Sequence, residues 1–80
     1  DLAVTSIQIH QTNWLIDPPQ SPFSCEVKVR YRQRSESCQV LPGNDGTACI
    51  EMQSPIFGVA PGQAAVFYDG RRVLGGGWIR

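Results

Sequence analysis

Turn-forming residues interrupt this chain at seven places, and from residue 42 onward they leave at most seven residues between one turn signal and the next. This spacing limits the fold more than any other feature of the sequence. Such short intervals leave room for β-strands and almost none for helices. The sequence therefore predicts an all-β fold. The turn signals are Asp17-Pro18-Pro19, Ser21-Pro22, Pro42-Gly43-Asn44-Asp45-Gly46, Ser54-Pro55, Pro61-Gly62, Asp69-Gly70 and Gly75-Gly76-Gly77.

The clearest strand pattern covers residues 24–32. Cys25, Val27, Val29 and Tyr31 alternate there with Glu26, Lys28, Arg30 and Arg32, the period of a strand with one buried and one solvated face. We expect Asn44-Asp45-Gly46 and Asp69-Gly70 to form hairpin turns, because these residues tolerate a positive φ. The other expected strands are 3–10, 14–16, 37–41, 47–52, 58–60, 64–68, 72–74 and 78–80.

The length of 80 residues allows one small domain and no second one. About six short strands without helices must protect their edges, so we expect a small closed or nearly closed barrel over residues 1–80. The chain begins with Asp1 and not with Met, which favours a fragment of a longer polypeptide. Equal numbers of acidic and basic residues, seven of each, exclude a global positive field, so any basic surface is local.

The cysteines and the histidine form no recognisable reactive or metal-binding pattern. Three cysteines without a CxxC pair and one histidine, His10, argue against a zinc site and against a disulfide framework. We interpret Cys25 as a buried filler of its strand; Cys38 and Cys49 have more polar flanks. No residue is predicted to be catalytic. No apolar run is long enough for a membrane helix, so a cytoplasmic location is expected.

The segment 64–68 departs from simple alternation because both of its faces are apolar. Ala64, Val66 and Tyr68 point one way, and Ala65 and Phe67 point the other. Only one side can face the core of a small barrel, so the other set, with Ala65 and Phe67 as our candidates, is predicted to pack against another domain. The alternative is that Ala65 and Phe67 lie under the loop 14–23.

Several segments together resemble the C-terminal end of the bacterial tRNA-specific 2-thiouridylases, over about residues 2–79. Lys28-Val29-Arg30-Tyr31-Arg32-Gln33 matches a strand motif of that family, and Phe57-Gly58 departs from the Arg-Ala that many members carry. The other matching segments are Asn13-Trp14-Leu15, the run 61–70 from Pro61 to Gly70, and Val73-Leu74-Gly75-Gly76-Gly77-Trp78-Ile79.

The resemblance implies a barrel of the aminomethyltransferase type at the end of an enzyme that thiolates the wobble uridine of tRNA with ATP. In that family the ATP site and the sulfur-carrying cysteines lie in other domains, so this chain is expected to hold no cofactor. The implied partners are tRNA, the enzyme's own central and catalytic domains, and a sulfur-donor protein that acts elsewhere on the enzyme. The barrel is then an accessory module that helps to bind tRNA or braces the catalytic domain.

The basic side chains of the segment 24–32 are the best candidates for a contact with RNA. Lys28, Arg30 and Arg32 share one strand face, and Arg34 continues the charge. Their spacing suits successive phosphates, and the alternative is a solvated face balanced by Glu26 and Glu36. Two other roles for the chain stay open: a purely structural packing module, or a similar barrel from an aminomethyltransferase-like or translation-factor-like protein. Gly75-Gly76-Gly77 is interpreted as a close backbone approach and not as a phosphate loop.

Overall fold

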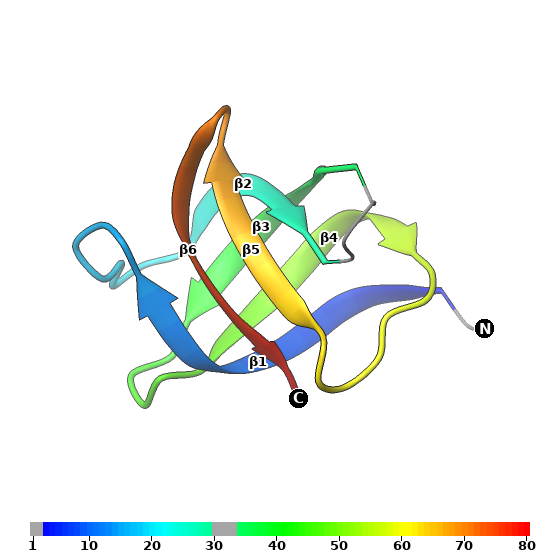
Figure 1. The fold of residues 1–80 in the computed structure, drawn as a ribbon, viewed down its shortest axis with the longest axis horizontal. Helices are drawn as coiled ribbons and strands as arrows, with labels where there is room; N and C mark the ends of the chain where they lie inside the picture. Colours follow the sequence, from blue (N-terminus) through cyan, green and yellow to red (C-terminus); the bar gives the residue numbers. More distant parts are fainter. Residues whose placement is uncertain (1–2, 30–33) are drawn as a thin grey trace.

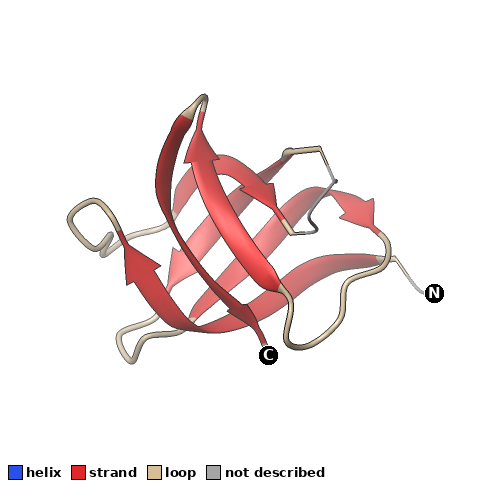
Figure 2. Cartoon of the chain, viewed as in Figure 1, coloured by secondary structure: helices blue, strands red, loops and turns tan. Residues whose placement is uncertain are grey.

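The computed structural model describes residues 3–29 and 34–80, which form a closed antiparallel β-barrel (Figure 1). Around the barrel the strand order is β1-β4-β3-β2-β5-β6. Its strands are β1 Val4–Trp14, β2 Phe23–Lys28, β3 Glu36–Pro42, β4 Ala48–Ile56, β5 Ala64–Asp69 and β6 Arg72–Ile79. The described residues contain strands and loops and no helix, so none of them belongs to a helix that could cross a membrane (Figure 2). The predicted all-β barrel is confirmed.

Two strands each join two segments that the sequence predicted as separate strands, and β4 extends to Ile56, past its expected end at residue 52. Residues 4–14 form one strand, β1, because a register shift between His10 and Asn13 bends the strand without ending it. Gln11 lies at this shift with a φ of 52°, an uncommon conformation for a residue with a side chain. The bend lets β1 pair with β4 along its first half and with β6 along its second half, which closes the barrel.

The second strand of this kind is β6, which continues through the three consecutive glycines. A Cβ atom on Gly76 would collide with the carbonyl oxygen of Ala65, and one on Gly77 would lie 2.9 Å from the carbonyl oxygen of His10. The neighbouring backbones thus occupy the space of the missing side chains. The interpretation of the glycines as a close backbone approach is confirmed.

The core follows the predicted alternation. Val27 and Val29 are buried as expected, whereas Tyr31 lies outside the described residues. Phe67 is the largest side chain with no exposed surface. The ring of Trp14 stacks on it with a centroid distance of 5.4 Å, and Gly75 lies between them, since it pairs with both residues. Because Gly75 has no side chain, the two aromatic rings meet across an intervening strand.

Both predicted hairpin turns are present. Asp69 pairs with Arg72 around Gly70, which has a φ of 61°. In the connection from β3 to β4, the amide of Gly43 donates a hydrogen bond to the carbonyl of Thr47, and Gly46 takes a φ of 80°. Turn chemistry therefore sets the register of β3 on β4 and of β5 on β6.

Candidate functional site

Lys28, Arg30, Arg32 and Arg34 form the predicted basic stripe, and the structure describes only part of it. Lys28 is the last residue of β2, is half-buried, and lies opposite Val66 of β5 on the outer side of the barrel. Arg34 is exposed shortly before β3. Arg30 and Arg32 lie outside the described residues. The described cations are therefore on the outside, and the stripe itself stays a prediction.

The expectation that Ala65 and Phe67 form an interdomain surface is wrong. Their exposed fractions are 1% and 0%, and both belong to the barrel core. Ala65 opposes Gly77 and Phe67 opposes Gly75 on β6, so the space left by glycines inside the barrel is filled from β5. The outward set is Ala64, Val66 and Tyr68, with Ala64 exposed and the other two half-buried.

Two members of this outward set, Ala64 and Val66, line a shallow apolar groove of about 270 Å³. The glycines of β6 form its floor, because a run of residues without side chains leaves a depression between larger neighbours. Leu15 and Trp78 on its edge are 65% and 48% exposed. We call this feature the glycine groove, and its lining residues are Gln11, Asn13, Leu15, Ala64, Ala65, Val66, Val73, Gly75, Gly76, Gly77 and Trp78.

Strand pairing places Lys28 beside the glycine groove. Lys28 opposes Val66, Val66 opposes Gly76, and Gly76 opposes Asn13, so these residues form one row across β2, β5, β6 and β1. The row begins with a cation, crosses an apolar centre and ends with an amide. A predicted basic residue and the apolar surface thus share one face of the barrel.

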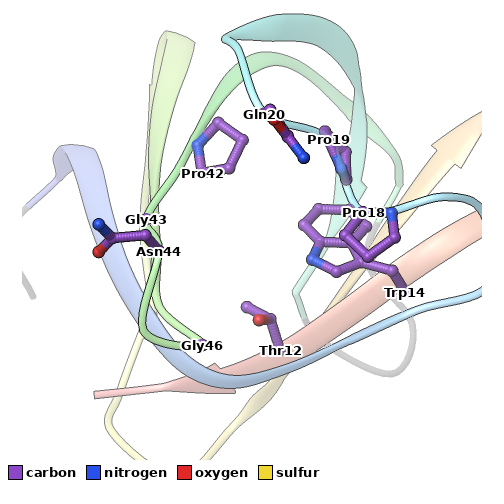
Figure 3. Close-up of a pocket in the computed structure, with 9 residues that line it drawn as sticks. All are labelled: Thr12, Trp14, Pro18, Pro19, Gln20, Pro42, Gly43, Asn44 and Gly46. Atoms are coloured by element: carbon purple, nitrogen blue, oxygen red, sulfur yellow. The ribbon is translucent and has the colours of Figure 1, made fainter.

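A larger pocket of about 820 Å³ opens at one end of the barrel, between the loop that follows β1 and the β3–β4 hairpin (Figure 3). Trp14 contributes to its wall, but its ring already stacks on Phe67 and meets Phe23 edge-on at 5.9 Å. Sequence reasoning missed the pocket, since it joins two distant loops. The lining contains no ionisable side chain and so offers no acid or base. The residues that line the pocket are Thr12, Trp14, Pro18, Pro19, Gln20, Pro42, Gly43, Asn44 and Gly46.

The cysteines occupy two different environments. Cys25 and Cys38 are buried, which confirms the interpretation of Cys25 as a core residue, and their Sγ atoms lie 3.8 Å apart. Cys49 is half-buried, with its Sγ atom 3.4 Å from Ser6 Oγ and 3.2 Å from the Gln8 amide that donates to it. Within residues 3–29 and 34–80, no three His, Cys, Asp or Glu side chains gather as they would around a metal ion.

Comparison with known proteins agrees with this architecture. The sequence model of the family described as the aminomethyltransferase beta-barrel domain matches residues 4–79. The tRNA-specific 2-thiouridylase of Syntrophotalea carbinolica is 49% identical over 69 residues, which are 85% of this chain and 19% of the relative. That of Desulfosudis oleivorans is 44% identical over 80 residues, 100% of this chain and 22% of the relative.

A third relative, the tRNA-specific 2-thiouridylase of a Synechocystis species, is 46% identical over 72 residues, 89% of this chain and 20% of the relative. The chain thus spans about a fifth of the length of the curated relatives that it matches. The family match covers nearly the whole barrel, from the start of β1 to the end of β6. The chain therefore belongs to the aminomethyltransferase β-barrel domain family, in the form that occurs in tRNA-specific 2-thiouridylases.

Proposed function

We propose that the chain is the C-terminal accessory barrel of a cytoplasmic enzyme that uses ATP to thiolate the wobble uridine of tRNA. The observation that carries this proposal is the similarity of nearly the whole barrel to tRNA-specific 2-thiouridylases. The barrel performs no chemistry itself. ATP is bound, and sulfur is received from a donor protein, by domains outside this chain.

In this enzyme the barrel contacts the tRNA backbone through Lys28, Arg30, Arg32 and Arg34. The position of Lys28 on the outer face and the exposure of Arg34 support this role. Side chains on one face of a strand repeat at about 6.8 Å, which suits successive phosphates. Phosphate contacts position an RNA without reading its bases, so the barrel contributes affinity and not selection among tRNAs.

The test is the simultaneous change Lys28→Gln, Arg30→Gln and Arg32→Gln in the full-length enzyme. Each lost phosphate contact should reduce the slope of log affinity against log salt by about 0.7 to 0.9, and binding of different tRNAs should weaken alike. Gln keeps a long polar side chain on the strand while removing the charge. Affinity is measured by filter binding or fluorescence anisotropy over a series of salt concentrations.

The matched control is the double change Arg71→Gln and Arg72→Gln at the tip of the β5–β6 hairpin. Both residues are exposed cations of the same barrel, outside the predicted stripe. We expect the control to leave the tRNA affinity and its salt slope unchanged. A folded triple variant that binds tRNA with the parent's affinity and salt slope would show that the stripe is only a solvated face.

The apolar outer face supports a second role, as a brace for the rest of the enzyme. Leu15, Val73 and Trp78 expose apolar surface around the glycine groove. The matched relatives are about five times as long as this chain, so the proposed occupant is the central or catalytic domain of the same polypeptide. Burial of this face against that domain would hold the barrel, and with it the basic stripe, in a fixed position relative to the catalytic domain.

A further inference from the structure

Two thiols face each other inside the barrel, and neither the family match nor the proposed function gives them a role. Cys25 on β2 and Cys38 on β3 are direct cross-strand partners, with their Sγ atoms 3.8 Å apart. Their exposed fractions are 7% and 6%, so both are buried without being completely sealed from solvent. Among the three cysteines of the chain, these two alone form a close sulfur pair.

The backbone geometry suits a disulfide bond. Directly opposed residues of antiparallel strands have Cα atoms about 4.5 to 5.5 Å apart, which lies within the range of about 4.4 to 6.8 Å that disulfides require. The sulfur atoms would have to approach by roughly 1.8 Å to reach the bond length of about 2.05 Å. Rotation about χ1 of the two short side chains can supply this movement, and the strands need not be re-paired.

The hydrogen bond between the two thiols prepares one of them to react. This contact lowers the pKa of Cys38, because the Cys38 thiolate can accept a hydrogen bond from the Cys25 thiol, and this effect exceeds the opposing effect of burial. The same contact raises the pKa of Cys25, and burial is the second cause of this rise. Loss of one proton from the pair therefore leaves one thiolate, favoured at Cys38, which accepts a hydrogen bond from the remaining thiol.

We infer that Cys25 and Cys38 are an oxidation site at which hydrogen peroxide links β2 to β3 through a disulfide bond. The Cys38 thiolate attacks one peroxide oxygen and breaks the O–O bond, which gives a sulfenic acid and hydroxide. The sulfur of Cys25 then displaces the hydroxyl group of the sulfenic acid, and the proton of Cys25 leaves with it as water. The hydroxide takes up the proton that Cys38 had released, so two sulfurs supply two electrons and two waters form.

This bond would join the two ends of the segment that carries the predicted basic stripe. The residues between Cys25 and Cys38 include Lys28 and Arg34. A crosslink over a separation of 13 residues restricts the unfolded chain, and on this basis the oxidised barrel should unfold roughly 12 to 23 °C above the reduced one. The inference does not depend on tRNA binding or on the identity of the full-length enzyme.

The experiment uses the 80-residue chain with Cys49→Ser, so that Cys25 and Cys38 are its only thiols. The folded protein is treated with hydrogen peroxide, and free thiols, intact mass and peptide connectivity are measured. We expect both thiols to disappear together, the mass to fall by two hydrogen atoms, and the peptides with Cys25 and Cys38 to be linked. Dithiothreitol should restore both thiols and return the melting temperature to its original value.

The control adds Cys25→Ala to the same background. Its Cys38 lacks a second thiol, so peroxide should leave it as a sulfenic or more oxidised acid, with a mass gain and no rise in melting temperature. The inference is overturned if the two-thiol protein, folded throughout by circular dichroism, keeps both thiols or gains oxygen atoms on each sulfur separately. It is also overturned if the link forms only between two chains or only after unfolding in urea.

Discussion

Phe67 shows how a single residue organises this barrel. It has no exposed surface, stacks on Trp14, and fills the interior where β6 contributes Gly75. Trp14 also meets Phe23, so three aromatic residues from β1, β2 and β5 form one packed group. Aromatic pairs of this kind contribute about 0.5 to 1.5 kcal/mol beyond the apolar area that they bury.

At this scale we predict that Phe67→Leu lowers the free energy of unfolding. Loss of the stack on Trp14 alone should cost about 0.5 to 1.5 kcal/mol, although Leu keeps an apolar side chain in the core. Phe57→Leu is the matched control, since Phe57 is 60% exposed, and its effect should stay within about 0.5 kcal/mol. Urea unfolding at an unchanged m-value measures both. Equal effects of the two changes would mean that the aromatic stack does not stabilise the core.

At the scale of the element, β6 depends on small residues between two close neighbours. It pairs with β5 on one side and with β1 on the other, and it forms the floor of the glycine groove. The atoms that approach Gly76 most closely belong to the backbone of β5, at Ala65 and Val66. Backbone atoms cannot rotate away as a side chain does, so an added methyl group must separate the two strands.

We therefore predict that Gly76→Ala costs about 1 to 3 kcal/mol of stability, although alanine is by itself less unfavourable in strands than glycine. Gly70→Asn is the matched control: Gly70 has a φ of 61° and open space around its Cβ position, and Asn tolerates that conformation. Thermal unfolding and amide exchange of β5 and β6 measure the difference. If Gly76→Ala were as stable as Gly70→Asn, the close approach of β5 would have no energetic consequence.

At the scale of the whole molecule, the barrel has two unlike features on its outside. The end pocket is framed by prolines, amides and a threonine, whereas the glycine groove has apolar edges and Lys28 beside it. Apolar side chains that are exposed together mark surfaces that meet another molecule or domain. The groove therefore supports the proposed brace, and the neighbouring lysine supports a position close to RNA.

If the glycine groove packs against another domain, changes in the groove should affect the full-length enzyme but not the isolated chain. Leu15→Gln combined with Trp78→Gln should change the stability of the isolated chain little, because Leu15 is 65% and Trp78 48% exposed there. In the full-length enzyme the same changes should loosen the barrel. Faster amide exchange along β5 and β6, and faster proteolysis between the barrel and the preceding domain, would report this.

Phe57→Gln in the full-length enzyme serves as the control, since Phe57 is exposed but does not line the glycine groove. It should leave exchange and proteolysis as they are in the parent. If Leu15→Gln with Trp78→Gln behaves like this control, the groove does not contact the rest of the polypeptide. Thiolation of tRNA, measured in parallel, shows whether loss of the contact affects activity.

The local features of this protein could be predicted from its sequence alone. Turn residues located the hairpins at 44–46 and 69–70, and alternation identified the buried side of β2 at Val27 and Val29. These features depend on the conformational limits of Gly, Asn and Asp and on the two-residue period of a strand. Both signals can be recognised from residues that are neighbours in the sequence. The family resemblance was also carried by local segments, namely 13–15, 28–33, 61–70 and 73–79, and the comparisons confirmed it.

Which apolar face of β5 lies inside the barrel depended on tertiary contacts. Alternation separates Ala65 and Phe67 from Ala64 and Val66, but both sets are apolar, so the choice depended on the glycines of β6 and the ring of Trp14. The facing thiols of Cys25 and Cys38 and the pocket between two distant loops likewise arise from strand register and barrel closure. Those contacts join residues far apart in the chain, and no local pattern encodes them.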